Sequence, residues 1–311
     1  MNKNSRKIVT SYIDPDMDGI GSMYAYVEFL RKKGEVAEYY FEGTPKKEVG
    51  IVLEKFKIQL KCANKVSKDD DIVIVDNNEL NFIPKGITQE QIVQIIDHHP
   101  RRPWLDNNTK VNCQIELIGA AATLIAERFK NENIEISKES AILLYYGIIS
   151  NTMNLKIKLT SARDIEMATW LKNKVPELTD EITKEIFTRK SEIGDNLESE
   201  MEIGFKNPMV TIKWSIGQLE IANAEQFLLK YESEIRSILD KVSVENDIEY
   251  ISVNIMDILN GYNILIAGNK KTADLLSENF DFFEFENLKA KTTKFISRKE
   301  IVRSIAEKYK K

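Results

Sequence analysis

Three carboxylates lie close together near the start of the chain, directly after a short apolar run. Asp14, Asp16 and Asp18 follow the apolar residues 8–9, and residues 23–33 then show the periodicity of a helix. Crowded carboxylates repel one another unless protons or a cation neutralise them. Since hard divalent ions favour oxygen ligands, a Mg²⁺ or Mn²⁺ site is one interpretation. A polar loop whose aspartates cap the helix is the other, and this stretch alone does not separate them.

Two later apolar runs also end in residues that can bind a metal. The run at residues 72–75 ends in Asp76, and the run at residues 92–96 ends in the tripeptide Asp-His-His at residues 97–99. A single histidine would more often be a packing residue. The chain has two histidines in all, and an Asp-His-His tripeptide after a strand indicates a metal ligand beside a group that contacts phosphate or a leaving group.

These polar segments need elements that bring the ends of separate strands together. Apolar runs near residues 8, 36–41, 72 and 92 alternate with helical patterns at residues 20–33 and 47–56. This alternation predicts an α/β domain with a doubly wound, mainly parallel sheet and helices on both faces. The carboxyl ends of the strands are the usual ligand site of such a sheet.

A shift in composition then marks a second domain. Residues 179–202 are rich in charge, and after Pro208 the predicted elements are strands at 210–215, 250–256 and 262–267 and helices at 222–242 and 273–278. A chain of 311 residues is also long for a single core. We expect a first domain over residues 1–190 and a smaller α/β domain over residues 195–311.

Composition excludes several classes of protein. The formal net charge of −5 provides no overall basic field for gripping nucleic acid. Cys62 and Cys113 are too few for a disulfide framework, which favours a reducing compartment. Residues 1–7 are polar and basic without an apolar segment behind them, unlike an ordinary signal peptide. Apolar runs such as 141–149 fall short of the roughly 18 residues of a membrane span. We therefore expect a cytoplasmic protein with no membrane partner.

Three ordered motifs at strand ends resemble the DHH phosphoesterase superfamily, which includes family II inorganic pyrophosphatases, exopolyphosphatases and RecJ-like exonucleases. They are Asp-Met-Asp-Gly at residues 16–19, Val-Asp-Asn-Asn-Glu at residues 75–79 and Asp-His-His at residues 97–99. Segments 215–220, 256–260 and 297–299 are similar to the C-terminal domain of the pyrophosphatases and related exopolyphosphatases. The Gly-Gly-Gly-His tract of RecJ-like enzymes does not occur in the sequence. The resemblance implies an active site in a cleft between a metal-binding domain and a phosphate-clamping domain.

The same resemblance implies a set of metal ligands. One or two Mn²⁺ or Mg²⁺ ions would be held by Asp16, Asp18, Asp76 and His98, with Asp76 bridging the ions of a two-metal site. His99 would act in catalysis and contact the substrate.

Cationic residues would bind the phosphates of the substrate. Arg298 and Lys299 are the catalytic and substrate-binding cations that the resemblance implies, and Lys206 is a weaker candidate. Arg101 follows the histidine pair closely, and its guanidinium could bind phosphate or simply be solvated. Residues 297–300 also form the Ser-x-x-Glu pattern of a capping box, which is the structural alternative for this segment.

Three positions depart from the pyrophosphatase pattern. Tyr12 and Asn77 stand where the family has histidines, and Asn151 stands where it has a metal-binding aspartate. Asn151 offers an amide oxygen but no charge, so we expect a weakened second metal site. If residues 12–18 are extended, alternate side chains share a face. We therefore predict that Asp14 or an ordered water replaces the missing ligand near Tyr12.

The predicted function is hydrolysis of phosphoanhydride bonds, with inorganic pyrophosphate as the first-choice substrate. An exopolyphosphatase is one alternative, and a phosphodiesterase of short oligonucleotides or cyclic dinucleotides, which would need a base-stacking surface, is another. A catalytically weak, phosphate-binding regulatory protein is the third. The expected partner is a small phosphate anion, with nucleic acid limited to short oligonucleotides and a homodimer as the candidate assembly.

Overall fold

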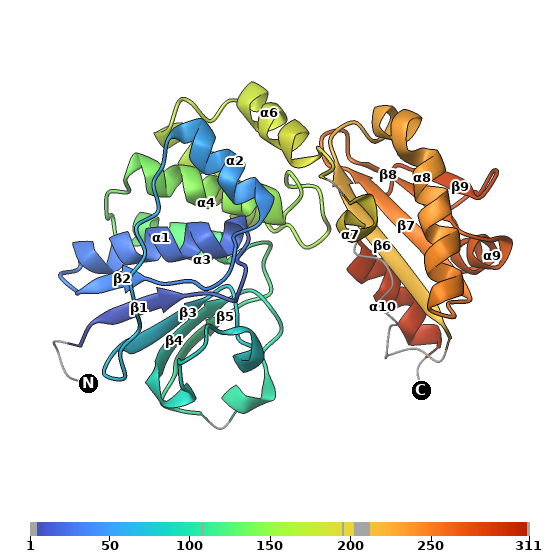
Figure 1. Ribbon diagram of the computed structural model, residues 1–311. Coiled ribbons are helices and arrows are strands. Elements are labelled where there is room, and N and C mark those ends of the chain that lie inside the picture. The colour runs from blue at the N-terminus through green and yellow to red at the C-terminus, as the bar shows by residue number, and fades with distance from the viewer. Residues whose placement is uncertain (1–4, 107, 195, 202–211, 310–311) are drawn as a thin grey trace. The chain divides into compact units, whose positions relative to one another are not determined.

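The structure is a computed structural model that describes residues 5–106, 108–194, 196–201 and 212–309 (Figure 1). Two compact units make up the chain. The first contains residues 1–155 and 159–186, and the second contains residues 156–158 and 187–311.

The first unit is built on a five-stranded sheet in the order β2-β1-β3-β4-β5, in which every paired strand is parallel. Its strands are β1 (Lys7–Thr10), β2 (Ala37–Tyr39), β3 (Asp71–Val75), β4 (Ile92–Asp97) and β5 (Asn112–Ile115). The predicted α/β class with a mainly parallel sheet is confirmed. Sequence patterns did not indicate β5, because its Asn-Cys-Gln-Ile stretch lacks an apolar run and lies at the sheet edge.

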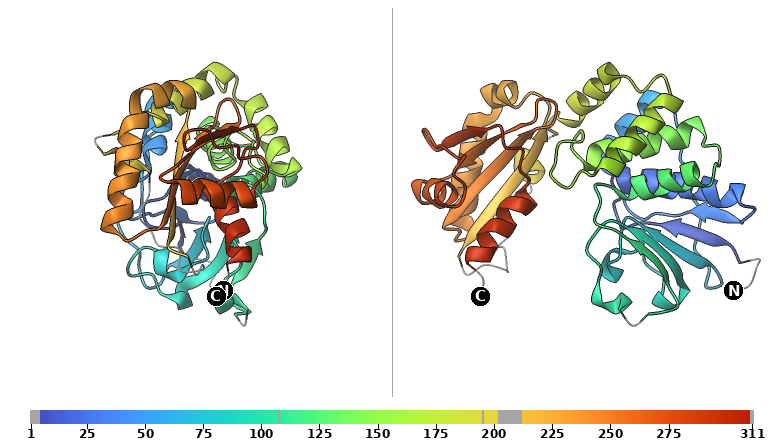
Figure 2. Two further views of the ribbon diagram at one scale, coloured as in Figure 1. Left: turned by 90° about the vertical axis from the view of Figure 1, so that its right-hand side faces the viewer. Right: turned by 180° about the vertical axis from the view of Figure 1, so that it is seen from behind.

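Helices cover one face of this sheet, and shorter segments cover the other. The helices of the unit are α1 (Met17–Lys32), α2 (Lys47–Phe56), α3 (Ala121–Asn131), α4 (Lys138–Asn151), α5 (Ala162–Lys174) and α6 (Asp180–Lys190), the last of which ends within the second unit. Figures 1 and 2 show α1, α3 and α4 on the same side of the strands. On the opposite face, Ile8, Ile72 and Ile74 pack against loop residues that include Leu105 and Val111. The second layer that we expected to be helical is therefore made by loops and three short 3-10 helices, η1 (Leu80–Phe82), η2 (Gln89–Gln91) and η3 (Pro103–Leu105).

Helices α1 and α4 cross with their backbones in contact. A Cβ atom added to Gly21 would lie 2.5 Å from the carbonyl oxygen of Leu143, and one added to Gly147 would lie 3.3 Å from the Cα atom of Asp18. No larger residue fits at Gly21 without separating the helices. The crossing fixes the start of α1 against the C-terminal half of α4.

The second unit contains a mixed four-stranded sheet in the order β6-β7-β8-β9. Its strands are β6 (Trp214–Ile221), β7 (Tyr250–Asp257), β8 (Tyr262–Ala267) and β9 (Lys289–Thr292), and its further helices are α7 (Leu197–Glu200), α8 (Ala224–Glu245), α9 (Lys270–Asn279) and α10 (Arg298–Lys308). The β6–β7 pair is parallel and the other pairs are antiparallel. Residues of α7 and α8 pack on one face, and residues of α9 and α10 pack on the other.

The position of β6 corrects the predicted strand at residues 210–215. Residues 210 and 211 lie outside the described residues, and β6 pairs with β7 along its whole length, from Trp214 opposite Tyr250 to Ile221 opposite Asp257. Gly217 and Gln218, which lie beyond the predicted strand, are strand residues because β7 supplies the partner for each of them.

Of the helices in the described ranges, none has both the length and the apolar composition that crossing a lipid bilayer requires.

Candidate metal centre

The first carboxylate of the site is held by the N-terminal ends of two helices. Asp18 lies in the first turn of α1 and is buried, and its two oxygens accept hydrogen bonds from the backbone N–H groups of Ala121 (2.8 Å) and Ala122 (2.7 Å) at the start of α3. Asp16 is the N-cap of α1, where its Oδ1 atom accepts from the N–H groups of Asp18 (3.0 Å) and Gly19 (3.1 Å). The capping interpretation is therefore correct for Asp16, whereas Asp18 points inward.

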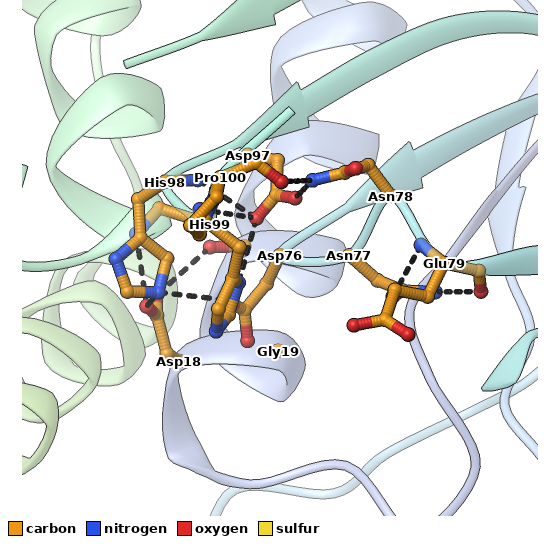
Figure 3. Close-up of polar contacts among 12 residues, drawn as sticks. Asp18, Gly19, Asp76, Asn77, Asn78, Glu79, Asp97, His98, His99 and Pro100 are labelled. Carbon is orange, nitrogen blue, oxygen red and sulfur yellow. Dashed lines mark hydrogen bonds and ion pairs between the residues drawn. The ribbon is translucent and has the colours of Figure 1, made fainter. Parts of the chain in front are cut away.

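The second carboxylate comes from the end of β3. Asp76 is buried and has a φ of 56°, a left-handed conformation, and its side chain lies beside the histidines that follow β4 (Figure 3). Its Oδ1 atom lies 3.2 Å from the Nε2 atom of His98, which is also 3.8 Å from the Oδ2 atom of Asp18. Among the described residues, the buried Oδ1 atom of Asp76 has no hydrogen-bond partner. A buried carboxylate oxygen in this state requires a proton or a cation.

The orientation of His98 shows where that cation would bind. The Nδ1 atom lies 2.9 Å from the backbone oxygen of Ile118. A carbonyl oxygen only accepts hydrogen bonds, so Nδ1 carries the hydrogen. In the neutral ring, Nε2 then presents a lone pair to the carboxylates of Asp76 and Asp18. Either a second proton or a metal ion must lie between these groups, and a histidine held by a carbonyl through its other nitrogen is typical of a metal ligand.

Asp97 and His99 complete the motif. Asp97 is fully buried, and its Oδ1 atom accepts from the N–H groups of His98 (2.7 Å) and His99 (3.2 Å) and lies 2.9 Å from the Nδ1 atom of His99. One ligand atom from each of Asp76, Asp97, His98 and His99 lies within 4.8 Å of the others, so this group could hold a metal ion. Because the Asp97 oxygens already bind several donors, this carboxylate orients the histidines.

Asn78 is a supporting residue that we did not single out from the sequence. It is buried, and its Nδ2 atom donates to the carboxylate of Asp97 and to the backbone oxygen of Pro100. Its Oδ1 atom accepts from the N–H of Arg102 at 2.9 Å, and its backbone oxygen accepts from the Trp104 indole at 2.8 Å. The sequence did offer one signal for this role, because Asn78 lies two residues after the carboxylate that ends a buried strand. Its neighbour Asn77 closes its own turn through the backbone of Glu79 (Figure 3).

Asn151 lies at the end of α4 and points its amide nitrogen into the carboxylate and histidine group. The Nδ2 atom is 2.9 Å from the backbone oxygen of Gly119 and 3.2 Å from both the Asp18 Oδ2 atom and the His98 Nε2 atom. Two amide hydrogens can serve the oxygens of Gly119 and Asp18, which only accept. As the metal ligand that we predicted, Asn151 would have to turn its Oδ1 atom inward and give up these two hydrogen bonds.

The structure contradicts the argument that placed Asp14 among the ligands. Its φ is 57°, so residues 12–18 are not one extended run, and its exposed side chain accepts a hydrogen bond from the Thr44 N–H at 2.6 Å. Gly43 has a φ of 87°, and a Cβ atom there would lie 2.1 Å from the Asp14 Oδ1 atom. Asp14 thus anchors this loop, and as the ligand that we predicted it would have to give up the hydrogen bond from Thr44. Burial raises the pKa of Tyr12, so its phenol stays neutral beside Asp16.

The predicted phosphate-binding cations differ in their hydrogen bonds and in the unit to which they belong. Arg101 uses its guanidinium within its own loop, where it donates to the Leu105 oxygen at 2.8 Å, so its proposed phosphate contact would cost that bond. Arg298 and Lys299 begin α10 in the second unit, and the capping box of Ser297 and Glu300 is present. Lys206 lies outside the described residues.

Protons held by this group should make metal binding depend on pH. Burial raises the pKa of Asp18 to about 7 and the pKa of Asp76 well above its ordinary value. For His98, burial disfavours the charged ring, but the carboxylate of Asp76 outweighs it and raises the pKa to about 10. The folded protein without metal therefore binds protons that the unfolded chain has released between about pH 4 and about pH 10, so its stability falls as the pH rises through this window.

A divalent cation must displace these protons, so its affinity should rise as the pH is raised from about 6 to about 9. Calorimetric titration of Mn²⁺ in buffers with different ionisation enthalpies counts the protons released, and we expect at least one per ion near neutral pH. Binding without proton release would contradict the shared-proton arrangement.

Comparisons with known proteins agree with this geometry. Residues 7–148 match the model of the DHH family, N-terminal domain. A Streptococcus thermophilus protein named probable manganese-dependent inorganic pyrophosphatase is 26% identical over 318 residues, covering 98% of this chain and 99% of the relative. The fold is similar to that of a Methanococcus jannaschii protein assigned to family II inorganic pyrophosphatases, with a TM-score of 0.69, 23% identity and coverage of 97% of this chain and 99% of that one.

A second structure, an exopolyphosphatase-related protein from Bacteroides fragilis, has a TM-score of 0.50 at 16% identity and covers 99% of this chain and 93% of its own. Both structural likenesses concern the fold. The parallel sheet of the first unit, the Asp-His-His tripeptide and the carboxylates at its strand ends all lie within residues 7–148, the range that is similar to the DHH family N-terminal domain.

Proposed function

We propose that this protein is a metal-dependent hydrolase of phosphoanhydride bonds and that inorganic pyrophosphate is its substrate. The observation that carries the proposal is the buried Asp76 Oδ1 atom, which has no hydrogen-bond partner among the described residues and faces the His98 Nε2 atom at 3.2 Å. The likeness over almost the full chain to a protein named as a manganese-dependent pyrophosphatase supports the choice of substrate.

The donor set fits a hard divalent ion. Asp18, Asp76 and His98, with Asp16 beside them, would hold one or two Mn²⁺ or Mg²⁺ ions, since these ions favour carboxylate oxygen and accept imidazole nitrogen. A bound ion supplies positive charge that activates water and neutralises phosphoryl oxygens. The Ile118 oxygen holds the His98 ring in the tautomer that offers Nε2 to the ion.

The remaining residues would act on the phosphate groups. The Asp97 Oδ1 atom lies 2.9 Å from the His99 Nδ1 atom and orients this ring, whose Nε2 atom would then contact a phosphoryl oxygen or the leaving group. Arg298 and Lys299 would bind the phosphate oxygens as permanent cations. In this proposal residues 1–190 form the metal-binding domain and residues 195–311 the phosphate-binding domain, with Lys206 as a further candidate.

A substrate panel tests the proposal. Pyrophosphate, tripolyphosphate and a linear dinucleotide should be incubated separately with Mn²⁺, Mg²⁺ and Co²⁺, and phosphate release measured with and without a chelator. We expect release from pyrophosphate with Mn²⁺ or Mg²⁺ and loss of this activity with the chelator. Release from tripolyphosphate alone would favour an exopolyphosphatase, and cleavage of the dinucleotide alone would favour a phosphodiesterase. Tight phosphate binding without turnover under any metal would favour a regulatory protein. A cytoplasmic location and a homodimer stay predictions.

A further inference from the structure

We propose that three amide side chains, Gln218, Asn254 and Asn263, position Arg298 and Lys299 for phosphate binding. We call these three residues the amide ladder. The inference rests on the proposed function, because it concerns the cations that would contact the substrate. It assigns a role in binding to residues of the second sheet that carry no charge.

The amide ladder crosses three neighbouring strands on one face of the sheet. Gln218 is on β6 and lies opposite Asn254 on β7, and Asn263 is on β8. Asn254 and Asn263 are fully buried. The neighbouring side chains Trp214, Ile216 and Leu265 on this face are apolar, and they share one core cluster with Leu276 of α9 and Ile301 of α10. Amides at these positions are therefore exceptions within an apolar layer and need a specific reason.

The reason is the backbone of Ile296, which precedes α10. The Nδ2 atoms of Asn254 and Asn263 both donate to the Ile296 oxygen, at 2.9 Å and 2.6 Å. The Oδ1 atom of Asn263 accepts from the Ile296 N–H at 3.2 Å. Asn263 also donates to the Oδ1 atom of Asn254 at 2.6 Å, which joins the two amides. Side chains thus satisfy both backbone groups of Ile296, as a paired strand would.

The third amide fixes the first residue of α10. The Oε1 atom of Gln218 accepts a hydrogen bond from the Arg298 N–H at 2.7 Å. The Nε2 atom of Gln218 donates to the Glu220 carboxylate at 3.4 Å. The first N–H groups of a helix have no partner within the helix, so Gln218 takes a donor that solvent would otherwise satisfy. The capping box fixes Ser297, whose N–H donates to Glu300 at 2.9 Å.

Three consecutive backbone positions, 296 to 298, are therefore each held by a side chain. This arrangement sets the direction in which α10 begins and hence the positions from which Arg298 and Lys299 extend. Restricting the backbone of a binding cation reduces the ordering that a ligand must otherwise bring about. If the amide ladder only held the loop before α10 in place, it would stabilise the fold without a specific effect on phosphate binding. Measurements of stability and of phosphate binding therefore distinguish the two roles.

The test is a pair of double-mutant cycles on the full-length protein with Mn²⁺ and pyrophosphate. Asn263→Ala and Gln218→Ala are each made alone and together with Arg298→Ala, and kcat and KM are measured well below the melting temperatures. We expect each single ladder variant to lower kcat/KM about tenfold. In the Arg298→Ala background, the same changes should lower it by clearly less than tenfold, because one of the two cations that they position is gone. Gln218→Ala also guards against a folding defect, since Gln218 is less buried than Asn263.

Ser252→Ala is the matched control. Ser252 is buried on the same face of β7, two residues from Asn254, and its Oγ atom has no hydrogen-bond partner among the described residues. This variant should leave kcat and KM unchanged. Equal effects of the ladder changes in both backgrounds, or no effect in either, would overturn the positioning role while hydrolysis by the wild type upheld the proposed function.

If the wild type does not hydrolyse pyrophosphate, the proposed function fails, and the same cycles are measured by calorimetry as pyrophosphate affinity. Coupling to Arg298 in those affinities would still support the positioning role. Absence of coupling, or of any pyrophosphate binding, would overturn it.

Discussion

Replacing Asp76 with asparagine should abolish metal-dependent pyrophosphate hydrolysis and lower the number of ions bound. Asparagine keeps the size of the side chain and tolerates the φ of 56° at this position, so the change removes the charge and one acceptor oxygen while keeping the shape. We expect turnover to fall by roughly 10²–10³-fold or more, as for loss of a central electrostatic group. The metal-free variant should melt at the same or a higher temperature, because one of the carboxylates that repel each other is removed.

Glu79→Gln is the control for this prediction, since it neutralises a carboxylate three residues away that pairs with Arg102. It should bind metal and turn over substrate as the wild type does. Phosphate release and metal content by elemental analysis are the measurements. An Asp76→Asn protein that keeps its turnover and its metal would remove Asp76 from the metal centre.

Replacing Asn151 with aspartate should strengthen metal binding and weaken the fold without metal. The Nδ2 atom lies 3.2 Å from the Asp18 carboxylate, so an aspartate would place a third negative charge in a buried group. Without a cation this repulsion, together with loss of the donor to the Gly119 oxygen, should cost about 1–3 kcal/mol of stability. With a cation the extra charge becomes a ligand, and we expect Mn²⁺ affinity to rise at least about tenfold, which is about 1.4 kcal/mol.

Melting curves with and without Mn²⁺ show both effects at once. The variant should melt below the wild type when the metal is removed and gain more from saturating Mn²⁺ than the wild type gains. Asn154→Asp, three residues further along, is the control for added charge in the same segment. If Asn151→Asp binds Mn²⁺ no more tightly than the wild type, Asn151 is not the position that limits metal affinity.

The parts of the fold and site that the sequence predicted are those encoded locally. Asp76 follows an uninterrupted β-branched run, and Asp97 and His98 follow a run broken only by Gln94, so both the strand and the polar residues at its end can be read from about eight residues. The alternation of such runs with helical patterns was enough to predict a parallel sheet. In contrast, β5 forms because β4 offers an edge, and its own residues carry no strand pattern.

The parts that were missed depend on contacts between distant residues. Nothing near Asp14 in the sequence shows that its carboxylate binds the Thr44 N–H, thirty residues away. The sequence likewise provided no indication that the Arg101 guanidinium donates to the backbone oxygen of Leu105. Asn254 and Asn263 did leave a signal, namely an amide within an otherwise apolar strand, but their common partner, Ile296, becomes apparent only when the strands are placed side by side.

The contact between α1 and α4 also has a consequence for which ions the centre can accept. A Cβ atom added to Gly147 would lie 3.3 Å from the Cα atom of Asp18, so the position of Asp18 is set by main chain and not by a layer of deformable side chains. Metal–oxygen distances are about 2.0–2.1 Å for Mg²⁺ and about 2.3–2.6 Å for Ca²⁺, a difference of only a few tenths of an ångström. If Asp18 binds the ion, as we propose, a crossing that cannot yield by that amount would favour ions of one radius over larger or smaller ions of the same charge.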